Sequence, residues 1–175
     1  FQRRNSSEDI NNEIFGYVWN GLLAAGYPCM RALEEGDELC AALWREGFVS
    51  TVYTKDSDLL TQGVGIVCYK EENSPDVLRC YELNTLLNIL GVTFQQFVDV
   101  CIYSGCDFNE KSKGIGFATA LKKIKEYGSL DNIFPSPQST ARFLPSADHR
   151  GCRVLFTPRP VRDCLVSEFL IEMRS

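Results

Sequence analysis

The chain has 175 residues, of which 45% are hydrophobic and 23% charged, as expected for one globular domain with or without an appendage. No apolar run approaches the roughly 20 residues that span a bilayer, so we expect no membrane partner. The first residues lack the apolar core of a secretory signal, so we do not expect this segment to be one. The sequence also starts without methionine, and from this we expect a fragment or a processed product.

The net charge of −5 is unevenly distributed. Residues 1–110 hold 7 basic and 17 acidic side chains, whereas residues 111–175 hold 11 basic and 6 acidic ones. This asymmetry suits an acidic, cation-binding site beside a surface that binds phosphates. Charge alone fits a solvated acidic half with a basic tail equally well.

The eight cysteines include no Cys-x-x-Cys pair, and His149 is the single histidine. Zinc sites favour closely spaced pairs of such ligands, so the spacing does not predict one. Several cysteines lie in apolar stretches, as Cys68 and Cys101 do, where a thiol packs as a small hydrophobic group. We expect reduced, structural cysteines in an intracellular protein.

The apolar spacing predicts an N-terminal helix from about residue 7 to residue 25 and a second helix over 35–46. The β-branched and aromatic run 48–54 predicts a strand. The resulting order, a helix, then a glycine turn, then a strand, is typical of a parallel sheet covered by helices. Two further strands are expected at 64–69 and 77–81. Short helices are expected at 83–90 and 94–103. The pattern of residues 111–127 predicts two helices joined by a tight glycine turn. After residue 132, prolines and serines indicate a linker.

Five acidic residues form the first candidate site: Glu35, Asp37, Asp56, Asp58 and Asp107. Two of them follow directly on the predicted strand 48–54, where ligands of α/β sheets gather. Converging carboxylates repel one another and persist by binding cations, and all-oxygen ligands favour Mg²⁺ or Mn²⁺. Two such ions about 4 Å apart can activate a water and stabilise the leaving oxygen of a phosphodiester.

Helix capping is the alternative explanation for each acid. Asp56 and Asp58 are suited to cap a short helix that begins at Leu59. Glu35 and Asp37 are suited to the first turn of their helix. For each acid considered by itself, capping is the favoured explanation. The joint occurrence of the acids within one unit of the fold instead favours a metal site.

A glycine hairpin forms the second candidate site. Lys113 is followed by Gly114, Ile115 and Gly116, with Ala120 beyond, which matches the helix-hairpin-helix pattern Gly-hydrophobic-Gly-x-x-x-Ala. The glycines let the backbone approach a phosphate, and the N–H groups that open the next helix donate to its oxygens. Lys122 and Lys123 add positive charge nearby. Such contacts bind the DNA backbone without reading its sequence.

In these residues the chain resembles the XPG/flap-endonuclease superfamily. The stretches 35–43, 54–60, 97–108 and 114–116 carry the resemblance, which covers roughly 24–134 with fainter similarity over 150–161. It implies that Glu35, Asp37, Asp56, Asp58 and Asp107 are both metal ligands and catalytic residues for two divalent ions. It also implies a hairpin that binds duplex DNA, with K⁺ held by the main-chain carbonyls of Ser112 and Ile115.

The resemblance further implies a fold and a cellular setting. We expect an incomplete PIN-like core over 1–107, a helix-hairpin-helix segment over 108–134, and a linker and tail over 135–175. The function implied is cleavage of flapped, branched or nicked DNA in replication or repair, in the nucleus, with a sliding clamp contacted through regions outside this sequence. The flap-endonuclease branch and the exonuclease branch remain open.

Three departures from the family pattern keep rival functions open. The N-terminal motif, with two further metal-binding aspartates, is absent. Phe108 stands where the family usually has tyrosine, and Ala118 and Thr119 stand where basic residues are frequent. A non-catalytic DNA-binding module is therefore the main alternative, and a PIN-like ribonuclease is a further one.

Overall fold

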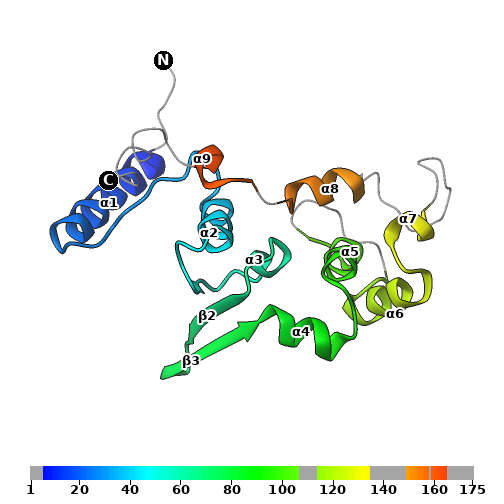
Figure 1. Cartoon of the computed structure of the whole chain (residues 1–175). Helices are drawn as coiled ribbons and strands as arrows, with labels where there is room; N and C mark the ends of the chain where they lie inside the picture. The colour runs from blue at the N-terminus through cyan, green and yellow to red at the C-terminus, as the bar shows by residue number, and fades with distance from the viewer. Residues whose placement is uncertain (1–5, 107–113, 135–148, 158, 165–175) are drawn as a thin grey trace, which may run out of the picture.

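The computed structural model describes residues 6–106, 114–134, 149–157 and 159–164 (Figure 1). This part of the chain has the expected α/β architecture. A small sheet and its helices lie on one side, and helices α5 to α8 gather on the other (Figure 1). In the described residues no single helix is long and apolar enough to span a membrane; α4 and α5 meet that test only together, and they are bent by 78°.

Helix α1 (Ser6–Ala24) confirms the predicted N-terminal helix, and it stands apart from the other helices in Figure 1. The apolar spacing that predicted this helix does not correspond to burial. Ile14 and Val18 are each 56% exposed and Leu22 is 41% exposed. Periodicity therefore predicted the local conformation correctly without indicating what the apolar side would contact.

The next elements alternate as predicted: α2 (Gly36–Arg45), β1 (Val52–Tyr53), α3 (Asp58–Thr61) and β2 (Ile66–Glu71). Strands β1 and β2 are parallel, with Val52 opposite Val67. Val52 is buried together with Leu59 and Leu60 of α3, so the short strand β1 is fixed by its place in the core. The loop 54–57, which joins β1 to α3, therefore lies at the carboxyl end of β1.

Strand β3 (Ser74–Glu82) makes the sheet mixed, in the order β1-β2-β3. It follows β2 after a two-residue connection and pairs with it in antiparallel orientation. A connection this short can join only antiparallel neighbours, because a parallel crossover needs a dozen or more residues. The parallel arrangement expected from the sequence therefore holds for β1 and β2, and β3 departs from it.

Cys68 and Cys80 lie directly opposite each other on β2 and β3 and form a disulfide, with their Cα atoms 4.1 Å apart. The expectation of reduced cysteines is wrong at this pair. The sequence spacing gave no sign of it, since the pairing depends on the register of an antiparallel strand pair that the sequence alone did not predict.

The second half of the described chain is helical. Helix α4 (Leu83–Leu90) ends at Gly91, and α5 (Phe94–Ser104) begins at Thr93, whose side chain and that of Gln96 form a capping box. Helices α6 (Phe117–Tyr127), α7 (Leu130–Ile133), α8 (His149–Leu155) and α9 (Val161–Cys164) follow.

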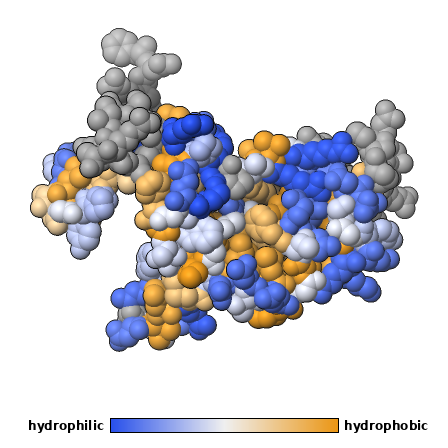
Figure 2. All heavy atoms as spheres, viewed as in Figure 1, coloured by the Kyte–Doolittle hydropathy of each residue, from blue (hydrophilic) through white to orange (hydrophobic). Residues whose placement is uncertain are grey.

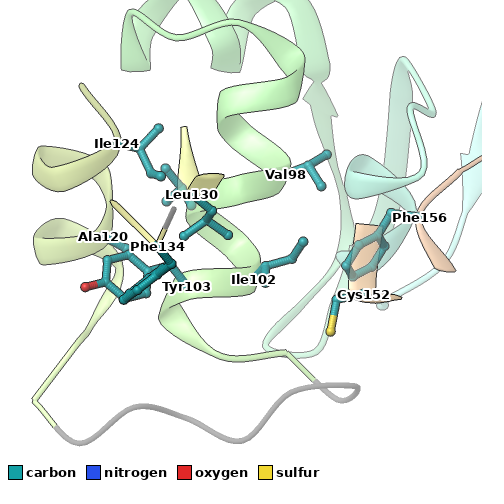
Figure 3. Close-up of a cluster of buried hydrophobic side chains, with 10 residues drawn as sticks. Val98, Ile102, Tyr103, Ala120, Ile124, Leu130, Phe134, Cys152 and Phe156 are labelled. Atoms are coloured by element: carbon teal, nitrogen blue, oxygen red, sulfur yellow. The ribbon is translucent and has the colours of Figure 1, made fainter. Parts of the chain in front are cut away.

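The core is built around α5. One cluster joins α5 to α6, α7 and α8, with Ile102, Ile124 and Leu130 among its fully buried side chains (Figure 3). A second joins the sheet, α2 and α3, and Phe94 packs against both clusters. Hydrophobic side chains also reach the surface on the β2–β3 hairpin (Figure 2), where Leu78 is 58% exposed.

Candidate metal site and nucleic-acid interface

Four of the five predicted acids lie in the described part of the chain, on two neighbouring elements. Glu35 immediately precedes α2 and is exposed, and Asp37 lies in the first turn of that helix and is half-buried. Asp56 lies in the loop that follows β1, and Asp58 is the first residue of α3. Asp107 falls outside the described residues.

Asp37 and Asp56 contact each other. Burial raises the pKa of the Asp37 carboxyl first, the negative charges of Asp56 and Glu35 raise it further, and a side-chain hydrogen bond with Asp56 adds to the effect. In a cation site without its cation, neighbouring carboxylates are expected to repel one another and to raise the pKa of at least one of them. The acids at the start of α2 and the loop after β1 therefore form one electrostatic group.

Asp56 also shapes the start of α3. Its Oδ1 accepts a hydrogen bond from the backbone N–H of Asp58 at 2.9 Å, and its own N–H donates to Thr54 Oγ1 at 3.1 Å. The capping alternative does not hold as expected, because α3 begins at Asp58, its N-cap is Ser57 and no side chain of the described residues caps it; the Asp56 carboxylate instead stabilises the turn that leads into the helix. The contact with Asp37 goes beyond capping, so the structural and electrostatic roles of Asp56 coexist.

The chemistry of these donors fits a hard divalent cation, since every candidate ligand is a carboxylate. In the residues that the structure describes, however, no three side chains of Asp, Glu, His or Cys are close enough together to hold a metal. The predicted ligand set is therefore only partly assembled by the described acids.

A cavity of about 520 Å³ opens beside the acids. Asp56, Ser57 and Asp58 line one part of it. The remaining walls come from α3, α4, the end of α5, Phe117 of α6 and Phe156, with Cys101 and Cys106 among the lining residues. Burial, and then the charge of Asp58, raises the pKa of the Cys101 thiol to about 12. The acids thus face the end of α5 at Ser104, three positions before residue 107.

The glycine hairpin lies next along the chain. Gly114 has a φ of +84°, a conformation that favours glycine, and Gly116 is the residue that precedes α6. Among the residues that the structure describes, a Cβ added at either glycine would meet nothing within 4 Å, so no described side chain blocks the approach to this backbone. Ile115 packs against the α5–α6 cluster and anchors the turn. Lys113 and Ser112 fall outside the described residues.

The two predicted DNA-binding lysines of α6 differ in their surroundings. Lys122 is exposed. Lys123 forms an ion pair with Glu126 at 3.5 Å, and its ammonium lies 5.2 Å from the ring centre of Tyr127. A phosphate contact by Lys123 would have to compete with these neighbours. The assignment of both lysines to DNA remains a prediction.

Sequence reasoning missed a buried charge network between α5, α7 and α8. Asp99 is fully buried and accepts hydrogen bonds from Arg153 Nε and Nη2, each at 2.7 Å, and from the Leu130 N–H at 3.0 Å. Arg153 Nη1 also donates to Asp131 at 2.5 Å. The available signal was Asp99 itself, one acid in the apolar run 97–102, because a buried carboxylate requires a partner.

Comparison with known proteins gives consistent matches. Residues 26–107 match the family model of the XPG I-region. The chain is similar to flap endonuclease 1 of Entamoeba histolytica, at 36% identity over 141 residues that cover 79% of this chain and 38% of that protein. It is likewise similar to flap endonuclease 1 of Ostreococcus lucimarinus, at 37% identity over 145 residues, covering 79% and 36% of the two chains.

Solved structures share the fold. Flap endonuclease-1 from Methanococcus jannaschii matches with a TM-score of 0.68 at 20% identity, over 91% of this chain and 52% of that one. The catalytic core of Rad2 in complex with a DNA substrate matches with a TM-score of 0.65 at 21% identity, over 92% and 53%. The chain spans less than two fifths of the length of the two curated relatives described above.

Proposed function

This chain belongs to the XPG/flap-endonuclease superfamily, and from that premise we propose that it is the internal nuclease core and DNA-binding segment of a structure-specific nuclease. The activity proposed is 5′ flap endonuclease or 5′–3′ exonuclease cleavage of DNA by phosphodiester hydrolysis with two metal ions. The proposed substrate is flapped, branched or nicked duplex DNA. Its setting would be replication or repair in the nucleus, with a sliding clamp as a further candidate partner.

The observation that carries this proposal is the contact between Asp37 and Asp56. It brings the first turn of α2 and the end of β1 into one acidic group beside an open cavity. Capping alone does not explain why a second carboxylate contacts Asp56. Two ionised carboxylates in contact destabilise the fold unless a cation binds between them.

Each part of the site has a separate role in the proposed reaction. Two bound Mg²⁺ or Mn²⁺ ions would supply an activated water and stabilise the leaving oxygen. Asp37, Asp56 and Asp58, with Glu35 and Asp107, would hold the ions. The N–H groups at the start of α6 and the open backbone at Gly114 and Gly116 would hold a DNA phosphate, with Lys122 nearby. The proposal includes K⁺ at the carbonyls of Ser112 and Ile115.

A non-catalytic DNA-binding module is the second candidate. It is favoured by the lack of a three-ligand cluster in the described residues, together with an open glycine hairpin. Titration calorimetry of the 175-residue chain with Mn²⁺ separates the two. A nuclease core should bind the ion at or below millimolar concentration, whereas absence of binding at that concentration would favour the module.

Asp56→Asn is the sharpest variant of the acid site. Asparagine keeps a side-chain oxygen for the Asp58 N–H, so the turn into α3 is retained while the charge is lost. We expect the Kd for Mn²⁺ to rise at least about 10-fold, because substitution of residues that only support metal ligands already weakens metal binding by about that factor. Asp76→Asn, on the exposed edge of β3, is the control and should bind as the unaltered chain does.

Cleavage should be measured in the longest protein that the gene encodes, on a labelled 5′-flap DNA with single-stranded RNA in parallel. We expect Asp56→Asn to reduce Mg²⁺-dependent cleavage of the flap by at least about 100-fold, with DNA binding retained. Full Mg²⁺-dependent cleavage by this variant would contradict the assignment. Preferential cleavage of the RNA would instead favour the ribonuclease alternative, and the product lengths distinguish the endonuclease from the exonuclease branch.

A further inference from the structure

Residues 159–164, here called the C-terminal strap, pack on helix α2. Val161 and Cys164 are buried with Leu39 and Ala42 in a small cluster of their own. At the two ends of α2, the Leu33 N–H donates to the Cys164 carbonyl at 2.8 Å and the Val161 N–H donates to Glu46 at 2.7 Å. Figure 1 shows α9 lying against α2. The strap is therefore fixed to both ends of the helix that begins after Glu35.

Arg159 links the strap to the acidic end of α2. Its Nε lies 3.1 Å from Glu38 Oε1, and its Nη1 lies 3.5 Å from Glu34 Oε2. Its Nη2 donates to the Asp163 carbonyl at 2.8 Å, and its own carbonyl accepts a hydrogen bond from Arg45. The guanidinium is thus held by the strap while it pairs with two acids of the α2 region.

Those two acids flank the candidate metal ligands in the sequence. Residues 34–38 contain four carboxylates and one glycine. Glu34 and Glu38 pair with Arg159, whereas Asp37 contacts Asp56. Arg159 therefore neutralises the acids that take no part in the candidate site. Without it, the four carboxylates of this five-residue segment at the start of α2 would repel one another with no positive charge between them.

We propose that Arg159 is a positioning residue of the metal site, and that through it the C-terminal strap holds the first turn of α2 in the conformation that presents Glu35 and Asp37. The proposal rests on the proposed function, because it assumes that these acids bind a divalent cation. Arg159 itself touches neither candidate ligand in the ion pairs described above, so it acts through Glu34, Glu38 and the helix that carries them.

The test compares three variants of the 175-residue chain in Mn²⁺ titrations. Arg159→Gln should raise the Kd for Mn²⁺ about 10-fold, the lower end of the effect of residues that support metal ligands. Arg159→Lys keeps a positive charge and should restore most of the affinity. Arg162→Gln is the control, because Arg162 is 78% exposed and pairs only with its neighbour Asp163, at 3.7 Å, among the ion pairs of the described residues. An unchanged Kd for Arg159→Gln, or an equal effect of Arg162→Gln, would overturn the proposal.

Two further measurements separate positioning from a loss of folding or of function. Hydrogen exchange of the Leu39 to Ala42 amides should accelerate in Arg159→Gln with little change elsewhere, and it requires no metal. In a Glu38→Gln background the effect of Arg159→Gln on the Kd should shrink, because one of its two partners is already neutral. If the chain without substitutions binds no Mn²⁺, the proposed function is contradicted. If hydrogen exchange in Arg159→Gln equals that of the chain without substitutions, the strap proposal is contradicted.

Discussion

The Asp131 carboxylate lies beside three basic side chains, those of Arg153, His149 and Arg150. Arg153 first, and then His149, lower the pKa of the Asp131 carboxyl, with Arg150 adding a further hydrogen bond. Because its pKa in the folded chain lies below the ordinary value near 4 of an unfolded chain, ionised Asp131 stabilises the fold above about pH 4. This contribution is lost progressively as the pH falls from there toward the lower, folded-state value.

We therefore predict that Asp131→Asn lowers the free energy of unfolding at pH 5 to 8, and that its difference from the unaltered chain shrinks below about pH 4. Urea denaturation across this pH range measures the difference. The side chain of Asp131 is 40% exposed, so high salt should reduce the effect. A difference that stays constant down to pH 2 would show that the Asp131 charge does not contribute.

At the same scale, the sequence indicated acids that lie close together better than it indicated the partners of buried charges. The sequence puts Asp37 in the first turn of a predicted helix and Asp56 just after a predicted strand, and the structure places the two in contact. The partnership of Asp99 with Arg153 joins residues 54 positions apart, and no local pattern encodes it. The assignment of all five acids to a metal stays a prediction, because Asp107 lies outside the described residues.

Among the elements, the turn into α6 gives the most direct test of DNA binding. Gly114 has a positive φ, so Gly114→Ala should cost about 1 kcal/mol of folding stability. Gly116 has an ordinary φ of −101°, and no atom of the described residues lies within 4 Å of a Cβ added there, so Gly116→Ala should leave stability within about 0.5 kcal/mol. If a phosphate approaches this backbone, the added methyl of Gly116→Ala will still weaken binding.

Fluorescence anisotropy with a flap DNA, paired with chemical denaturation, separates the two effects. Gly116→Ala is expected to reduce DNA affinity at unchanged stability, because the methyl occupies the path of the phosphate. Binding equal to that of the unaltered chain would show that the DNA backbone does not come close to Gly116.

The helices were predicted more accurately than the sheet, for a physical reason. Helical hydrogen bonds are local, so apolar spacing and turn residues predicted α1, α2, α4 and α5 close to their observed bounds. Strand pairing is not local. Strand β1 is two residues long where seven were expected, and β3 is antiparallel to β2. The strap on α2 was not predicted at all, because its few contacts join residues more than a hundred positions apart.

For the molecule as a whole, α5 is the element shared by both large clusters. Its fully buried Asp99 should be costly to alter, since removal of one member of a buried ion pair costs about 3 kcal/mol or more. We predict that Asp99→Asn destabilises the sheet side as much as the helical side, because Phe94 packs against both clusters. Asp76→Asn should have little effect.

The measurement uses Trp44, which packs against the cluster of the sheet, in a Trp19→Phe background. Denaturation followed by Trp44 fluorescence should shift to lower denaturant in Asp99→Asn together with the far-UV circular dichroism signal. A Trp44 transition that stays in place while the circular dichroism transition moves would show that the two sides unfold independently.

The strap has a practical consequence for deletion mapping. A truncation that stops after α8 would remove Val161 and Cys164, the buried neighbours of Leu39 and Ala42, and would release both ends of α2. Any activity lost in such a deletion would be assigned to the C-terminal residues, although the damaged part would be a helix more than a hundred positions earlier. Deletion boundaries in this chain should therefore fall beyond Cys164, or be replaced by point substitutions within the strap.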